Sequence, residues 1–166
     1  ILGPNIAALA RAGWEQPWSD RTEAPKPKRA QASAAPKWKP RGGKLASYAN
    51  ADIANTDDDP LYRTCSYDIK GYDLEIPNGT YRVTLRFCEP HFDQAGKRVC
   101  DVRLQGKTVA KRLDIFERVG KFAALDISFD GVEVANGRLL VRFPYVKSLP
   151  CVSAIAVEGA GLARRI

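Results

Sequence analysis

The chain has 166 residues, of which 45% are hydrophobic, 27% charged and 9% aromatic. A chain of this length can bury one hydrophobic core but is too short for two full domains. No run approaches the roughly 18 uninterrupted apolar residues that a membrane helix needs, so we expect no membrane partner. Met is absent even at position 1, which suggests that the sequence is a piece of a longer protein.

The net charge of +7 is concentrated at one end of the chain. Residues 1–44 hold nine Lys and Arg against three acidic residues, whereas residues 45–166 hold 17 against 16. A strongly basic domain would indicate nucleic-acid binding. Because residues 45–166 are nearly neutral, nucleic acid is not the partner that we expect, and residues 26–44 are the one segment that could bind it.

The first 44 residues divide into two predicted segments. Residues 6–12 suit a helix by composition and a strand by length, and we assign residues 1–23 to a first strand and its loop. Residues 24–40 combine Pro, Ala and Lys without apolar periodicity, which predicts a basic linker or long loop over residues 24–44. Trp38 in this segment is either pinned onto a domain surface, which we favour, or available to a ligand.

From Tyr72 onward, apolar and polar residues alternate, as is typical of half-buried strands. In residues 81–87 every second residue is apolar, from Tyr81 to Phe87. Asn-Gly and Asp-Gly pairs separate several of these segments and favour hairpins, hence antiparallel pairing. The pattern predicts an all-β, antiparallel β-sandwich or jelly roll. The other alternating segments are residues 99–105, 125–130, 139–143 and 153–157.

Sequence signatures of catalysis are missing. The single histidine, His91, excludes a site with two histidine ligands, and no Ser or Cys lies in a nucleophile motif. The densest acidic cluster is Asp57, Asp58 and Asp59, whose carboxylates could bind a structural calcium ion or simply form a solvated turn. We therefore expect no enzyme activity and no cofactor, with calcium as the one alternative.

The chain contains four cysteines, Cys65, Cys88, Cys100 and Cys151, none at the close spacing of a zinc ribbon. The alternation places Cys88 on the polar face of its strand and Cys100 on the apolar face of the next. These two side chains should therefore point away from each other. We expect free or buried thiols and keep one disulfide as the alternative.

Aromatic residues outside the alternating segments are the candidates for ligand contact. Sugar rings place their apolar C–H faces on aromatic side chains, while polar groups bind the hydroxyls. Each of these aromatic residues could instead cover the core. They are Tyr48, Tyr62, Tyr67, Phe92, Phe116 and Tyr145.

Four segments, together with the closing residues 150–158, resemble the malectin-type carbohydrate-binding domain family. They are residues 54–64 (ANTDDDPLYRT), 76–89 (IPNGTYRVTLRFCE), 96–102 (GKRVCDV) and 113–120 (LDIFERVG). The resemblance covers residues 45–159 in the family's order and spacing. It leaves residues 160–166 as a C-terminal tail.

The resemblance implies a galactose-binding-like β-sandwich that binds oligosaccharide or polysaccharide without catalysis, through loops at one end. By position it assigns Tyr48 and Phe92 as ligand aromatics. His91 stands where the family has a tyrosine and Ser148 where it has an acid. A buried, well-aligned carboxylate contributes roughly 1.5–3 kcal/mol to such a hydrogen bond, so the family's sugar preference should not carry over. Tyr62 and Tyr145 complete the expected carbohydrate-binding set.

Two functions remain open. The first is a carbohydrate-binding module attached to the catalytic domain of a secreted glycoside hydrolase, in an extracellular or periplasmic setting, where attachment raises the enzyme's effective concentration at its substrate. The second is a structural or interaction domain of such an enzyme that has lost sugar binding. The basic residues 26–44 could equally attract an anionic polysaccharide.

Overall fold

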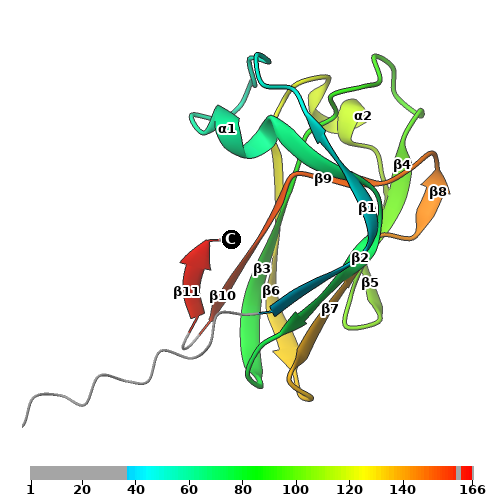
Figure 1. Ribbon diagram of the computed structural model, residues 1–166. Helices are drawn as coiled ribbons and strands as arrows, with labels where there is room; N and C mark the ends of the chain where they lie inside the picture. Colours follow the sequence, from blue (N-terminus) through cyan, green and yellow to red (C-terminus); the bar gives the residue numbers. More distant parts are fainter. Residues whose placement is uncertain (1–36, 160–161, 166) are drawn as a thin grey trace, which may run out of the picture. The chain divides into compact units, whose positions relative to one another are not determined.

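The computed structural model describes residues 37–159 and 162–165, in which two β-sheets pack face to face (Figure 1). The larger sheet has the order β1 (Lys37–Ser47), β2 (Thr64–Glu75), β7 (Arg138–Arg142), β4 (Val99–Leu104) and β5 (Lys107–Leu113). In addition, β8 (Tyr145–Lys147) pairs with β4, and β9 (Cys151–Val152) pairs with β2. The smaller sheet has the order β11 (Leu162–Arg165), β10 (Ala154–Gly159), β3 (Gly79–Phe87) and β6 (Leu125–Val134).

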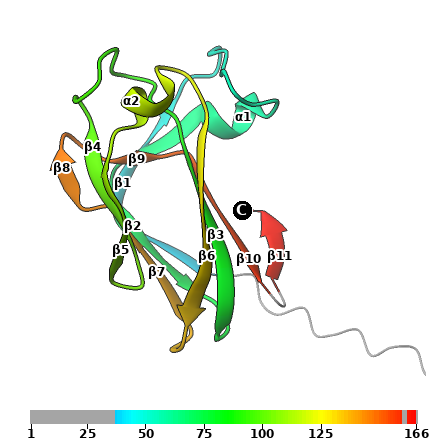
Figure 2. The ribbon, with the colours of Figure 1, turned by 180° about the vertical axis from the view of Figure 1, so that it is seen from behind.

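All of the described strand pairs are antiparallel, which confirms the predicted all-β, antiparallel sandwich. Two short helices, α1 (Asp59–Tyr62) and α2 (Ile115–Val119), lie at one end of it (Figure 2). The Asp114 side chain begins α2 by accepting a hydrogen bond from the Glu117 amide at 3.1 Å. Such a cap satisfies an amide that the helix itself leaves unpaired.

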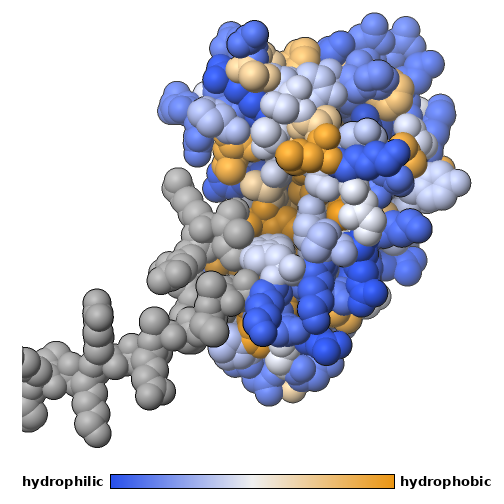
Figure 3. Space-filling view, viewed as in Figure 1, coloured by the Kyte–Doolittle hydropathy of each residue, from blue (hydrophilic) through white to orange (hydrophobic). Residues whose placement is uncertain are grey.

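The hydrophobic core lies between the two sheets because each central strand alternates inward and outward residues. In β3 the side chains of Tyr81, Val83, Leu85 and Phe87 are buried, as the alternation predicts. Burial of one such side chain contributes roughly 1.5–3 kcal/mol. The outer surface is mostly hydrophilic on the face that Figure 3 shows, with hydrophobic atoms gathered near its middle. Core partners from the facing sheet include Val102, Leu139, Val141 and Phe143.

The prediction of a linker over residues 24–44 is wrong for residues 37–44, which lie in β1 and pair with β2. Most β1 side chains are exposed, so the strand lacks the alternation by which the others are recognised. Trp38 packs on the core and contacts Tyr72 edge-to-face at 5.9 Å, in agreement with the favoured interpretation. The predicted segment 1–23 and residues 24–36 lie outside the described residues.

Two further predictions need correction. Residues 162–165 of the predicted C-terminal tail form β11, which pairs with β10. Cys88, predicted on a polar face, is only 1% exposed. It is buried because α1 and the loop around Ile53 cover that face, where Ile53, Tyr62, Cys88 and Ala124 form a second, smaller hydrophobic cluster.

All four cysteines lie in the described part of the chain, and each is a free, buried thiol. This agrees with the expectation from sequence. Burial raises the pKa of Cys88 and of Cys100 to about 12. The thiols therefore stay protonated at neutral pH and act as small apolar core groups.

Candidate functional site

A pocket of about 380 Å³ lies among the loops at the end of the sandwich that carries α1 and α2. Four segments of the chain form it: the end of β1 with the residues that follow, the start of β2, the loop that follows β3 and the chain between β8 and β9. Four of the six predicted site residues, Tyr48, His91, Phe92 and Ser148, line this pocket. The other lining residues are Ala46, Cys65, Tyr67, Pro90, Arg98 and Leu149.

Tyr48 is held at the pocket by its backbone and by its ring. Its amide donates a hydrogen bond to the Arg63 carbonyl oxygen at 2.7 Å. The ring packs edge-to-face on Phe122 with the centroids 5.9 Å apart. Burial raises the pKa of the Tyr48 hydroxyl, so the group is a neutral hydrogen-bonding partner at ordinary pH.

Glu89 holds the aromatic loop in place from beneath. Its Oε1 accepts hydrogen bonds from the backbone amides of His91, at 2.9 Å, and Phe92, at 3.1 Å. Its Oε2 accepts one from Arg98 Nε at 2.6 Å. Glu89 is fully buried and Arg98 only 8% exposed, so each of these buried polar side chains depends on the other for its partner.

Arg98 links the two sides of the pocket. One of its terminal nitrogens donates to the Leu149 carbonyl oxygen, next to Ser148. Its guanidinium carbon lies 5.0 Å from the centroid of the Phe92 ring, within the range of a cation–π contact. Burial lowers the pKa of Arg98, but its hydrogen bond and ion pair with Glu89 outweigh burial and raise it overall. Sequence reasoning missed this pair because nine residues separate its members and neither lies in a catalytic or metal motif.

His91 and Phe92 form one aromatic unit, with ring centroids 4.8 Å apart at 80°. Ser148, across the pocket, has a positive φ of 59°, which non-glycine residues adopt only at a local cost. With Tyr48, Tyr67 brings the aromatic side chains that line the pocket to four. The pocket therefore combines aromatic surface with a hydroxyl and a guanidinium, an arrangement suited to binding a polar ligand that has apolar faces.

Two predicted site residues lie elsewhere. Tyr62 is buried in the second hydrophobic cluster, 3% exposed, and its hydroxyl donates to Asp126 Oδ1 at 2.5 Å. Tyr145 is 69% exposed and lines a different pocket. Position in a loop, from which both were predicted, does not distinguish a loop that covers the core from one that borders a pocket.

Titration of Tyr62 should separate it from the exposed tyrosines. Burial, and then the Asp126 hydrogen bond, raise its pKa to about 12, whereas the unfolded chain ionises near 10. The folded state thus favours the protonated form, so this contribution to stability is complete below about pH 10 and is lost as the pH rises toward 12. We expect the absorbance of tyrosinate to show a component that titrates near pH 12 and that Tyr62→Phe removes. A titration that Tyr62→Phe leaves unchanged would contradict this assignment.

The acidic cluster at residues 57–59 gives little support to a calcium site. The Asp59 carboxylate forms an ion pair with Arg63, in which Oδ2 lies 2.9 Å from Nη2. The Asp58 amide donates to the Thr56 hydroxyl at 3.0 Å, as in a solvated turn. Within the described residues, no group of three His, Cys, Asp or Glu side chains is arranged to hold a metal ion.

Comparison with known proteins identifies the class of domain that this fold and pocket define. The family model of the malectin domain, a carbohydrate-binding domain family, matches residues 19–159. The chain belongs to the malectin domain family. The match begins before β1, so residues 37–44 fall inside the family domain.

Among characterised relatives, Malectin-B of Xenopus laevis is 40% identical over 92 residues, which are 54% of this chain and 33% of that protein. Malectin of Homo sapiens is 38% identical over 92 residues, 54% of this chain and 31% of that protein. The chain thus spans about a third of the length of these relatives. Neither helix in the described ranges is long and apolar enough to cross a membrane.

Solved structures show the same fold. A β-glucuronidase of Bacteroides uniformis matches 74% of this chain with a TM-score of 0.68 and 25% identity, and the match covers 14% of that enzyme. The plant receptor-like kinase ANX2 matches 72% of this chain with a TM-score of 0.61 and 14% identity, a likeness of fold alone. The domain therefore occurs as one part of much longer proteins.

Proposed function

We propose that this domain binds carbohydrate without catalysing a reaction, and that the sugar occupies the pocket between Tyr48, His91, Phe92 and Ser148. The observation that carries the proposal is the convergence of these side chains, from three separate segments, on one open pocket. The aromatic rings offer surfaces for the C–H faces of a sugar, and Arg98 and Ser148 offer hydrogen-bonding groups for its hydroxyls. Membership of a carbohydrate-binding family supports the same ligand class.

We further propose that the domain is an accessory part of a longer, secreted glycoside hydrolase. The fold's occurrence in one seventh of a bacterial β-glucuronidase supports this arrangement. Attachment would keep the catalytic domain near a polymeric substrate by raising its effective concentration there. The competing function, a structural domain without sugar binding, is favoured by Ser148 in place of the family's acid.

Binding to glycans tests the proposal. We expect calorimetry or affinity electrophoresis against plant and algal polysaccharides to show at least one ligand. Tyr48→Ala and Phe92→Ala should each lower the affinity for that ligand roughly 30-fold, since an aromatic anchor in a binding interface contributes about 2 kcal/mol.

Phe116→Ala is the matched control, because Phe116 is a half-buried aromatic residue of α2 that does not line the pocket. It should leave affinity unchanged. Circular dichroism should show that all three variants remain folded. If neither the wild-type protein nor the two pocket variants bind any polysaccharide in the panel, the result would favour the structural alternative.

A further inference from the structure

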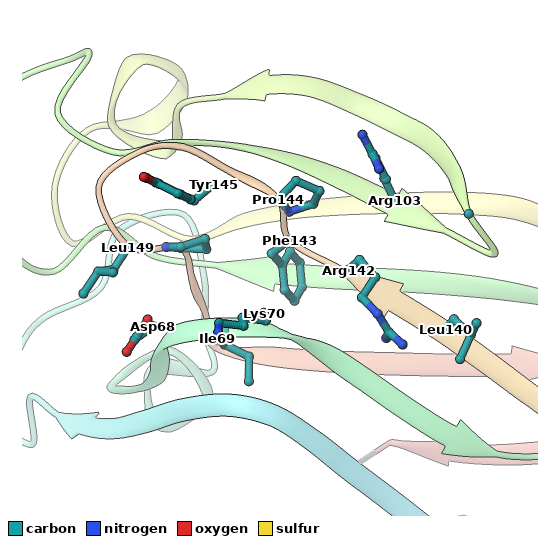
Figure 4. A pocket seen from close by; sticks show the side chains of 12 residues that line it. Asp68, Ile69, Lys70, Arg103, Leu140, Arg142, Phe143, Pro144, Tyr145 and Leu149 are labelled. Atoms are coloured by element: carbon teal, nitrogen blue, oxygen red, sulfur yellow. The ribbon is translucent and has the colours of Figure 1, made fainter.

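A second and larger pocket, of about 780 Å³, lies on the outer face of the larger sheet (Figure 4). Its lining side chains come from β2, β4, β7 and the chain around β8. Leu140 and Arg142 of β7 alternate with the buried Leu139 and Val141, so they point away from the core. The pocket therefore opens on the outer side of the sheet, and the core residues Ile69 and Phe143 border it from within.

The charges in this pocket are unbalanced. Three cationic residues, Lys70, Arg103 and Arg142, line it together with one acidic residue, Asp68. Arg103 and Arg142 are direct partners across the β4–β7 pair, an arrangement of like charges that destabilises a sheet. Asp73 supplies a carboxylate to Arg142, so within the described residues Arg103 is the member of the pair without an acidic partner.

Arg142 already has partners, but Lys70 and Arg103 do not. Arg142 lies 2.6 Å from Asp73 Oδ1 and donates to the Tyr72 carbonyl oxygen at 2.9 Å. Within the described part of the chain, neither Lys70 nor Arg103 forms an ion pair. Both side chains are exposed, so two cationic groups are available to a ligand at one pocket.

The rest of the pocket is apolar and aromatic. In Figure 4, Tyr145 and Leu149 lie at one end and Arg103 at the other, with Phe143 and Pro144 between them. Tyr145 is 69% exposed and Leu149 44% exposed, so both can contact a ligand directly. Leu149 also lines the pocket that contains Tyr48, His91, Phe92 and Ser148, here called the loop pocket. The two pockets therefore adjoin, and one extended chain could reach both.

We propose that this outer-face pocket is a second subsite that binds an acidic sugar unit. Arg103 and Lys70 hold its carboxylate or sulfate group, and Tyr145 receives its ring. This inference rests on the proposed function, which gives carbohydrate as the class of ligand, and it adds that the sugar carries a negative charge. A few cations beside an exposed aromatic ring fit a charged sugar better than a nucleic acid, which needs a row of cations along its phosphates.

Calorimetry with matched oligosaccharides tests the charge requirement. The probes are a hexamannuronate, the same hexasaccharide with its carboxyl groups esterified as methyl esters, and a sulfated hexasaccharide derived from heparin. We expect wild-type protein to bind the hexamannuronate at least tenfold more tightly than its ester. The sulfated probe shows whether the subsite distinguishes carboxylate from sulfate.

Variants locate the effect. Lys70→Gln combined with Arg103→Gln should reduce the affinity for hexamannuronate to that for the ester, without changing the affinity for the ester. Arg82→Gln is the matched control, since Arg82 is an exposed arginine of β3 in the other sheet. It should reduce hexamannuronate binding less than twofold. Phe92→Ala in the loop pocket should lower the affinities for the hexamannuronate and for its ester by the same factor. The preference for the acid should therefore be preserved.

The outcomes separate this inference from the proposed function. Equal affinity for acid and ester, or equal losses in the outer-face variant and in Arg82→Gln, would overturn the acidic subsite while leaving sugar binding intact. Failure of wild-type protein to bind any sugar would overturn both. Tighter binding of polyglutamate or oligo-dT than of the hexamannuronate, with the same dependence on Arg103 and Lys70, would show a general anion site and overturn the assignment to sugar.

Discussion

Glu89→Ala is expected to lower the free energy of unfolding by about 3–5 kcal/mol, because removal of one partner leaves the other charge of a buried ion pair uncompensated. Arg98 is 8% exposed and has no other carboxylate partner in the described structure. The same change removes the carboxylate oxygen that accepts hydrogen bonds from the His91 and Phe92 amides. Carbohydrate affinity should therefore fall with stability. Urea unfolding and calorimetry measure the two effects.

Two comparisons make this prediction specific. Asp130→Ala removes an exposed partner of Arg82, 3.4 Å away, and exposed pairs contribute only about 0–1 kcal/mol. The double variant Glu89→Leu with Arg98→Met replaces both buried charges and should recover most of the stability without recovering binding. If Glu89→Ala costs no more than Asp130→Ala, the buried pair does not hold the pocket together.

Gly71→Ala is expected to destabilise the domain by about 3 kcal/mol, at the upper end of the usual cost of overpacking. A Cβ atom there would lie 2.1 Å from the Val141 carbonyl oxygen and 3.1 Å from Arg142 Cα. These are backbone atoms of a paired strand, so β2 and β7 would have to separate. Gly71 also has a φ of +153°, which disfavours a side chain.

Gly131→Ala is the control for Gly71→Ala. Gly131 of β6 has a positive φ of 69°, but a Cβ atom at this position would meet no heavy atom within 4 Å. The substitution should cost about 1–2 kcal/mol, from backbone conformation alone. Thermal unfolding measures the difference. Equal losses of stability in the two variants would show that the close approach of β2 and β7 contributes nothing.

The close approach of β2 and β7 also places Lys70 beside Arg142. We therefore expect Gly71→Ala to lower the affinity for the acidic sugar as well.

The loop pocket could be predicted in part. Similarity to the family placed Tyr48, His91, Phe92 and Ser148, and the structure brings these four together. Tyr62 was misplaced because α1 turns its ring into the second hydrophobic cluster. Arg98 and Glu89 could not be found, since an ion pair depends on how a loop folds back on itself, which residue spacing does not reveal.

The sequence by itself determined the class of the fold, because a strand with one face in the core must alternate apolar and polar residues. This signal located β3, β4, β6, β7 and β10. Only the tertiary structure decided that residues 37–47 form a strand, since their side chains are largely exposed on both faces and carry no alternation. It likewise decided which charges meet across strands. The opposition of Arg103 and Arg142 follows from the register of β4 and β7, which long-range packing sets.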